Sequence, residues 1–155
     1  MNFDQAFEAL IGHEGGHVNN PADPGGETQF GICKRSYPNE DIAGMTLDRA
    51  KALYMRDYWT PAACESLPDG VRMDVFDMAV NSGVGAALRT VQKAVGAAAD
   101  GVLGPVTRQA VQDMQPAQFV ARFNAQRLLL MTSLPTWSTF GRGWAVRVAE
   151  QLMQA

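Results

Sequence analysis

The segment from His13 to Ile32 holds the residues best able to do chemistry. Two of its acids, Glu14 and Asp23, lie nine positions apart, and a hydroxyl, Thr28, lies five positions further on. Two Gly-Gly pairs and two prolines lie among them. This composition predicts a short, turn-rich excursion, which can place two carboxylates and a hydroxyl around one point.

The two acids are expected to differ in environment, as hydrolysis of a glycosidic bond requires. The apolar spacing over residues 3–11 predicts an amphipathic helix that Gly15-Gly16 ends. Glu14 then sits at the negative end of the helix dipole, where a carboxylate is disfavoured and a general acid is favoured. Asp23, in a Pro/Gly turn near water, is expected to stay ionised, and Thr28 could orient an attacking water. An Asx turn at Asp23 is an equally good interpretation of the same residues.

The pattern His13-Glu14-Gly15-Gly16-His17 also matches the H-E-x-x-H motif of zinc hydrolases. That motif needs both histidines on one face of a helix. Each glycine between them costs about 1 kcal/mol relative to alanine in a helix interior, and the chain has no other histidine. We therefore expect no metal and no cofactor, with the histidines flanking a cleft or facing solvent.

The elements that must position this segment are predominantly helical. The fold class expected is mainly α, with one small β-hairpin-like excursion near the N-terminus and a helical lobe. A brief strand is expected at residues 29–32. Helices are expected to begin after the N-caps Thr46 and Asp69 and at Pro105 and Pro116, and one is expected to stop at Asn81-Ser82-Gly83. Two further helices are expected over Ala86–Val95 and Trp137–Val148.

Length and composition are those of one soluble globular domain. The chain has 155 residues, 46% of them hydrophobic, and a formal net charge of −3. Two cysteines, Cys33 and Cys64, are too few for a disulfide framework, and we expect both to be reduced. The first residues lack the basic start of a signal peptide, and no apolar run is long enough for a membrane span. Synthesis in a bacterial cytoplasm is therefore expected.

Residues 14–32 closely resemble the E-G-G-(aromatic)-V-N-(x)-P-x-D-x-G-G-x-T-x-x-G-I signature of glycoside hydrolase family 108. These are N-acetylmuramidases of phages, prophages and some secretion systems. The resemblance implies a lysozyme-like α+β fold and makes Glu14 the general acid. The order of Glu14, Asp23 and Thr28 before Gly31-Ile32 is also similar to that of phage-type lysozymes, which makes Asp23 and Thr28 candidates. His17 departs from the signature, where an aromatic residue is usual.

The second half of the chain resembles the predicted peptidoglycan-binding region that accompanies this family, through residues 76–83 and 100–107. We expect one lysozyme-like domain over 1–155, with a catalytic motif region at 1–58 and a helical lobe at 59–151 that does not fold alone. Asn81 could hydrogen-bond a glycan, or cap a helix with Gly83. Other candidate substrate contacts are Tyr58, by stacking, and Asn20 and Gln29, although these residue types usually pack in cores or satisfy local backbone.

The resemblance therefore implies a peptidoglycan hydrolase, an endolysin that cleaves the β-1,4 bond between N-acetylmuramic acid and N-acetylglucosamine. Its partner would be the bacterial glycan strand, reached in the periplasm after holin-type release. It would act as a monomer, with inversion of configuration by analogy with phage lysozymes. No nucleic acid partner is expected. The alternatives are a non-catalytic peptidoglycan-binding or secretion accessory protein and a lytic transglycosylase.

The zinc and carboxylate interpretations differ in their response to a chelator. If Glu14 acts as a general acid without a metal, turbidity loss of purified cell walls should proceed at the same rate with and without EDTA. Loss of activity in EDTA that zinc alone restores would instead support the metal site.

Overall fold

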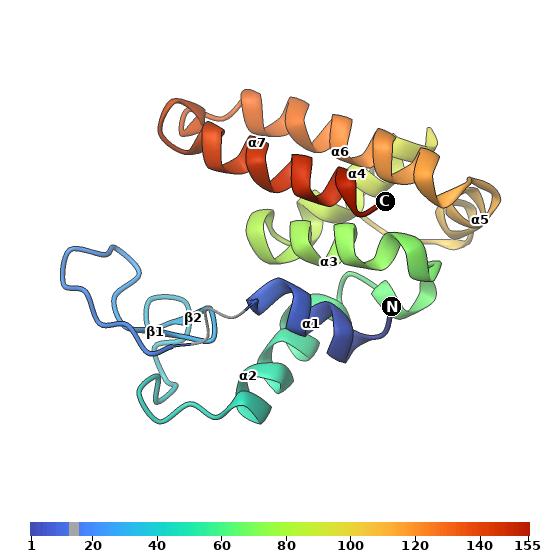
Figure 1. The fold of residues 1–155 in the computed structure, drawn as a ribbon. Coiled ribbons are helices and arrows are strands. Elements are labelled where there is room, and N and C mark those ends of the chain that lie inside the picture. The colour runs from blue at the N-terminus through green and yellow to red at the C-terminus, as the bar shows by residue number, and fades with distance from the viewer. Residues whose placement is uncertain (13–15) are drawn as a thin grey trace. The chain divides into compact units, whose positions relative to one another are not determined.

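The computed structural model describes residues 1–12 and 16–155. It divides the chain into two compact units, which we call the N-terminal unit (residues 2–57) and the C-terminal unit (residues 58–155 with Met1). The elements are α1 (Phe3–Ile11), β1 (Thr28–Gln29), β2 (Ile32–Cys33), α2 (Leu47–Tyr54), a π-helical turn (Met55–Trp59), a 3-10 turn (Cys64–Ser66), α3 (Asp69–Ser82), α4 (Val84–Val95), α5 (Pro105–Asp113), α6 (Pro116–Thr132) and α7 (Trp137–Met153) (Figure 1).

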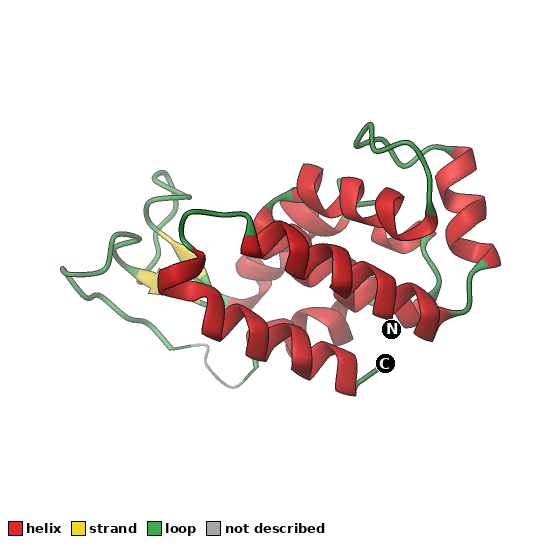
Figure 2. Cartoon of the chain, turned by 90° about the horizontal axis from the view of Figure 1, so that it is seen from above, coloured by secondary structure: helices red, strands yellow, loops and turns green. Residues whose placement is uncertain are grey.

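The expected fold class, mainly α with a small hairpin near the N-terminus, is confirmed. Figure 2 shows that helices dominate the described chain and that its strands are short. The strands β1 and β2 form a two-stranded antiparallel sheet, in which Thr28 pairs with Cys33 and Gln29 with Ile32. None of the helices in the described ranges is long and apolar enough to cross a bilayer.

Helix α1 begins at a reciprocal cap. The Asn2 side chain accepts a hydrogen bond from the Gln5 backbone N–H, and the Gln5 side chain accepts one from the Asn2 backbone N–H, both at 3.0 Å. This capping box satisfies two N–H groups that the first turn leaves without helical partners. The helix then buries Phe3, Ala6 and Phe7, the face that the apolar spacing predicts.

Helix α2 begins at Thr46, as predicted. The Thr46 hydroxyl accepts from the Arg49 backbone N–H at 3.1 Å. Within the N-terminal unit, the Tyr54 ring meets the Phe7 ring edge-on at 5.3 Å between centroids. Lys51 joins the same two helices through an ion pair with Asp4 at 2.9 Å. The helix does not stop at Tyr54 but widens into the π-helical turn that ends at Trp59.

Helix α3 is the central element of the C-terminal unit. It packs against α4 and α6, α6 packs against α4 and α7, and α5 packs against α4 (Figure 1). Six consecutive residues, from Asp74 to Ala79, are buried, so every face of this stretch is covered. A helix covered on all sides should be apolar all round. The two acids that it buries, Asp74 and Asp77, therefore need partners.

The loop between α4 and α5 is held by a buried side chain. The buried Gln92 side chain donates to the Val102 carbonyl at 2.9 Å and accepts from the Gly101 N–H at 2.8 Å. Gly101 has φ of +80°, which glycine adopts without steric cost. Pro105 and Pro116 occupy the first positions of α5 and α6, as predicted.

The N-cap predicted at Asp69 is wrong by one position. Pro68 is the cap, and Asp69 is the first residue of α3. Its carboxylate pairs with Arg72 at 3.0 Å and with the N-terminal ammonium of Met1 at 3.3 Å. The Asp69 carboxylate stabilises the N-terminus of α3 through its interaction with the helix dipole, although it makes no capping hydrogen bond.

Both cysteines are free thiols. Cys33 donates to the Ser36 hydroxyl at 3.2 Å. Cys64 is fully buried, and this burial raises the pKa of its thiol to about 12. The Cys64 thiol is therefore protonated at neutral pH and packs as a small apolar side chain.

The Asp74 carboxylate is paired with an amide. Its Oδ1 accepts from Asn124 Nδ2 of α6 at 2.7 Å, and only 5% of the residue is exposed. Burial is the largest influence on this group and raises its pKa to about 6, although the Asn124 hydrogen bond and the Arg127 charge both oppose the rise. The folded protein therefore holds a proton on Asp74 at pH values where the unfolded chain has lost it.

This shift gives a pH dependence of stability with a definite sign. The stabilising contribution of protonated Asp74 is complete below the unfolded pKa of 3.8 and is lost as pH rises to about 6. Asp74→Asn keeps an acceptor for Asn124 and cannot titrate. Urea unfolding between pH 4 and 7 should show a flatter pH profile for this variant, with a difference of up to roughly 3 kcal/mol across the window. The exposed acid Glu150, changed to Gln, is the control, and equal profiles for wild type and Asp74→Asn would contradict the assignment.

Candidate active site

Helix α1 ends earlier than the sequence predicts. Its last residue is Ile11, and Gly12 follows with φ of +60° and donates its N–H to the Glu8 carbonyl at 3.0 Å. The predicted stop at Gly15-Gly16 is wrong because the helix already ends at Gly12, whose positive φ is a conformation that glycine adopts without steric cost. The predicted general acid Glu14 lies outside the described residues, with His13 and Gly15. Gly16 and His17, which follow, are not helical.

The hairpin that follows is tighter than the predicted strand at residues 29–32. Phe30 and Gly31 form its two-residue turn with φ of +49° and +74°. Positive φ at both central residues matches the right-handed twist of the flanking strands. The Tyr54 hydroxyl donates to the Phe30 carbonyl at 3.2 Å and leaves no room for a Cβ at Gly31. Tyr54 thus fixes the hairpin turn to α2.

Asp23 lies in the turn between Asn20 and Gly26, and its side chain has a structural role. Its Oδ1 accepts from the Gly25 N–H at 2.9 Å, which is an Asx turn. One turn earlier, Asn20 Oδ1 accepts from the Ala22 N–H at 3.0 Å. Both residues are exposed. The Asx turn at Asp23 is therefore present, and among the described residues Oδ2 of the carboxylate has no hydrogen-bond donor.

Thr28 is fixed by its backbone. It exchanges two backbone hydrogen bonds with Val18, at 2.7 and 2.8 Å, and pairs with Cys33 across the sheet. Its hydroxyl makes only a long contact, 3.4 Å to the Gly26 carbonyl. A threonine whose backbone is fixed on both sides and whose hydroxyl is weakly held can bind a water or a substrate oxygen.

Gln29 is used within the protein. With its amide oriented to match its neighbours, its nitrogen donates to the carbonyls of Ile42 at 2.7 Å and Ala43 at 3.1 Å. These bonds tie the hairpin to the loop before α2. The geometry favours a structural role for Gln29 over the predicted substrate contact.

His17 pairs with Glu27, an acid that was not among the predicted site residues. Its Nε2 lies 2.6 Å from Oε1 of Glu27, one residue before Thr28. Both side chains are partly exposed, at 38% and 25%. The pair closes the excursion across the Val18–Thr28 bridge. Side chains alternate between the two faces of a strand, so His17 and Glu27, each one position before a bridged residue, lie on the same face. This alternation is the sequence signal from which their contact could have been predicted.

The remaining predicted residues, Tyr58 and Asn81, belong to the C-terminal unit. Tyr58 lies in the π-helical turn, and Asn81 lies in the last turn of α3. Asn81 is not the helix cap, because Gly83 takes that position. Its Nδ2 instead donates to the Asp77 carbonyl at 2.8 Å and contacts Asp77 Oδ1 at 3.3 Å.

Asp77 is held by two arginines from two other helices. Its Oδ2 lies 2.7 Å from Nη2 of Arg127 on α6, and its Oδ1 accepts from Nη2 of Arg147 on α7 at 2.6 Å. Asp77 and Arg127 are both buried, and Arg147 is 38% exposed at its side chain. With both donors of Asn81 engaged at Asp77, the orientation of the amide is set by this cluster. Its oxygen is left as an acceptor on the exposed side.

Asn81 also lines a pocket of about 280 Å³. The pocket combines the amide, the Ser82 hydroxyl and the indole of Trp144 with an apolar remainder: Ala86, Leu130, Met131 and Leu134. An aromatic ring beside a fixed amide is suited to a sugar that carries an amide substituent. Neither Trp144 nor the Asp77 cluster was predicted as part of a site, because both depend on contacts between helices far apart in the chain.

Comparison with known proteins agrees with these features. Residues 7–83 match the family model described as Glycosyl hydrolase 108, which spans the excursion, the hairpin and helix α3. The solved structure of SagA from Brucella abortus is similar to this chain, with 33% sequence identity and a TM-score of 0.86, over 98% of this chain and 92% of that one. No curated protein matches the chain.

The identity and coverage of the SagA match extend the similarity beyond the excursion to nearly the whole chain. The fold is lysozyme-like α+β, as the sequence resemblance implied. Together the two matches show that the chain belongs to the glycosyl hydrolase 108 family.

Proposed function

We propose that this glycoside hydrolase acts on bacterial peptidoglycan as an N-acetylmuramidase, cleaving the β-1,4 bond between N-acetylmuramic acid and N-acetylglucosamine. The observation that carries the proposal is the family match over residues 7–83, which contains the whole signature from Glu14 to Ile32. The described geometry supports it, because the excursion is built from turns and a hairpin that hold polar groups in fixed places.

In this proposal Glu14 is the general acid that protonates the glycosidic oxygen. The support is its position in the sequence, two residues beyond the cap that ends α1. A glycosidase needs a second carboxylate that stays ionised. Asp23 suits that role, since one of its oxygens is fixed by the Gly25 N–H and the residue is exposed.

In the same step, a water held by Asp23 and Thr28 would attack the anomeric carbon as the bond to the leaving oxygen breaks. A carboxyl separation of about 6.5–9.5 Å leaves room for a water and inverts the configuration, whereas about 5–5.5 Å gives a covalent intermediate and retention. We favour inversion, since the weakly held Thr28 hydroxyl is available to orient a water.

Release by a holin and action as a phage-type endolysin belong to the same proposal.

Asn81 and Trp144 would bind the glycan in the C-terminal unit. The free oxygen of Asn81 can accept from the N–H of an N-acetyl group, and the apolar lining of the pocket suits its methyl group. The indole of Trp144 can stack on a sugar ring. These contacts would hold one sugar of the glycan strand on the C-terminal unit.

Glu14→Gln tests the central role. Glutamine has nearly the same shape and cannot donate a proton as an acid, so the rate should fall by at least about a thousandfold, near the upper part of the range for general acid catalysis. The measurement is the release of reducing ends from purified cell walls, with the melting temperature as a check on folding. Wild-type activity in this variant would overturn the assignment. Anhydro-muramic ends, detected by mass spectrometry, would indicate a lytic transglycosylase instead.

Asp23 requires two variants, because its side chain also holds a turn. Asp23→Asn keeps the acceptor for the Gly25 N–H and loses the charge, whereas Asp23→Ala loses both. If Asp23 acts in catalysis, both should lose more than about tenfold in rate, equivalent to about 1.4 kcal/mol of barrier. Only Asp23→Ala should lower the melting temperature. A rate loss confined to Asp23→Ala would reduce Asp23 to a structural role.

A further inference from the structure

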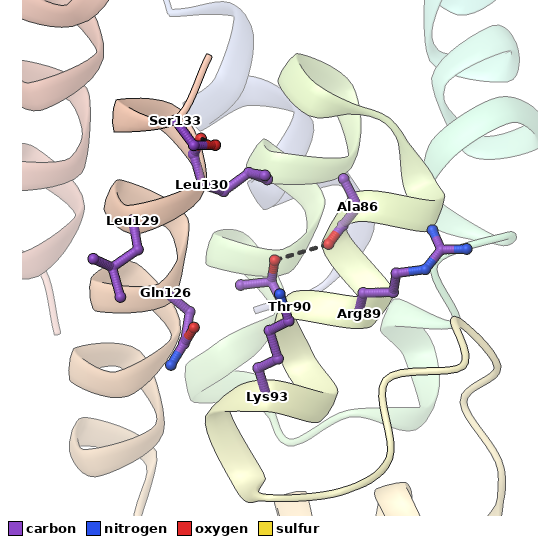
Figure 3. A pocket seen from close by; sticks show the side chains of 8 residues that line it. All are labelled: Ala86, Arg89, Thr90, Lys93, Gln126, Leu129, Leu130 and Ser133. Atoms are coloured by element: carbon purple, nitrogen blue, oxygen red, sulfur yellow. Dashed lines mark hydrogen bonds between the residues drawn. The ribbon is translucent and has the colours of Figure 1, made fainter. Parts of the chain in front are cut away.

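A second hollow of the C-terminal unit lies between α4 and α6, with a volume of about 410 Å³ (Figure 3). This volume is within the range of sites for small ligands, about 300–1,000 Å³. We call it the α4–α6 groove. Its lining residues are Ala86, Arg89, Thr90, Lys93, Gln126, Leu129, Leu130 and Ser133.

Lys93 provides the charge of the α4–α6 groove. Figure 3 shows its side chain rising along the groove toward Thr90, whereas the guanidinium of Arg89 points away from α6. Arg89 instead lies over Gly101, where an added Cβ would approach its guanidinium carbon to 3.4 Å. Among the described residues no acid lies within ion-pair distance of Lys93. The groove therefore presents an ammonium group without a carboxylate partner.

The polar groups beside Lys93 determine what else a ligand must offer. The hydroxyls of Thr90 and Ser133 donate to carbonyls of their own helices, to Ala86 at 2.8 Å and to Leu130 at 2.6 Å. Their oxygens remain as acceptors for an N–H donor. The amide of Gln126 makes no side-chain hydrogen bond to a described residue, so it can both donate and accept. This combination matches the N–H and C=O groups of a peptide.

The apolar part of the groove suits short alkyl groups. Leu130 and Ala86 lie inside it, and Leu129, at its edge, is 63% exposed. No aromatic ring is among the lining residues. This distinguishes the groove from the Trp144 pocket, because a neutral sugar gains from an aromatic face and gains little from an ammonium.

We propose that the α4–α6 groove binds the peptide stem of peptidoglycan, with Lys93 pairing with a stem carboxylate. This inference rests on the proposed function, since it names a second part of the same substrate. The stem carries carboxylates, peptide groups and alanine methyl groups, which correspond to Lys93, to the hydroxyl and amide groups, and to the leucines. Binding the stem would hold the cell wall on the enzyme at a site other than the bond that is cut.

The first test compares two forms of one cell wall with the full-length protein. One form is intact, and in the other an N-acetylmuramoyl-L-alanine amidase has removed the stems. Lys93→Glu should raise KM on the intact wall about tenfold, through loss of an ion pair and added repulsion, with kcat unchanged. On stripped strands Lys93→Glu should match wild type. Lys93→Arg should behave as wild type on both substrates.

Arg122→Glu is the matched control. Arg122 is exposed on α6 and is not among the residues that line the groove. Arg122→Glu changes the net charge of the protein by the same amount as Lys93→Glu. An equal rise in KM for Arg122→Glu would show a general charge effect and overturn the proposal. An equal rise on stripped strands would show that Lys93 pairs with the glycan, whose muramic acids keep a lactyl carboxylate after the amidase has acted, and this would also overturn it.

The second test measures binding without catalysis. The synthetic tetrapeptide L-alanyl-γ-D-glutamyl-L-lysyl-D-alanine, titrated into full-length protein at low salt, should shift the amide signals of α4 and α6 in NMR spectra. Lys93→Glu should abolish these shifts. Shifts confined to other helices, or unchanged affinity in Lys93→Glu, would overturn the groove assignment.

The two proposals can fail separately. If wild type binds the tetrapeptide through Lys93 but releases no reducing ends from either wall, the proposed hydrolysis fails and the stem site stands. If wild type cuts both walls and Lys93→Glu cuts them with unchanged KM, hydrolysis stands and the stem site fails.

Discussion

The C-terminal unit depends on one buried carboxylate. Asp77, on the central helix α3, is paired with Arg127 of α6 and Arg147 of α7, so three helices meet at a single charge. Removing one partner from a buried ion pair costs about 3–5 kcal/mol, because the remaining charge is left without compensation. The pair is not self-evidently stabilising, since Nε and Nη1 of Arg127 meet no acceptor among the described residues. Its clearer effect is to specify how α3, α6 and α7 align.

That alignment reaches the surface through Asn81. The amide nitrogen of Asn81 is held by the carbonyl and carboxylate of Asp77, one turn earlier on α3. A surface amide that would otherwise rotate is thereby fixed, and fixed polar groups bind a ligand with less loss of entropy. Trp144, on the same helix as Arg147, lines the same pocket. The buried charge thus positions both an acceptor and an aromatic ring.

Part of this architecture could be predicted from the sequence, and part could not. Local signals located the cap at Thr46, the prolines that open α5 and α6, and the stop at Gly83, because each depends on residues within one turn. The predicted end of α1 was wrong since Gly12 and Gly15-Gly16 are equally good stops by composition. The predicted strand at residues 29–32 was wrong because a non-glycine residue, Phe30, takes positive φ at the hairpin turn.

The same limit applies to the site residues: contacts between residues close in the sequence could be predicted, and contacts between distant helices could not. The Asx turn at Asp23 is a contact over two residues and was foreseen as an alternative. The contacts of Asp77 with Arg147, across seventy positions, and of Asn124 with Asp74, across fifty, carry no local signal. Gln29 shows a contact that the sequence did not indicate, since the carbonyls of Ile42 and Ala43 engage its amide nitrogen, and its contact with substrate stays a prediction.

The two hollows of the C-terminal unit differ in the chemistry that they present. The Trp144 pocket has an aromatic ring and a fixed amide and contains no charged lining residue, whereas the α4–α6 groove has an ammonium and no ring. Ala86 and Leu130 line both, so the hollows are neighbours on one surface. A polymer in which neutral sugars alternate with charged peptide branches presents the same two chemistries a short distance apart. Recognition of both would favour glycan that carries peptide stems over a bare glycan, because each site adds to the local concentration of the other's ligand.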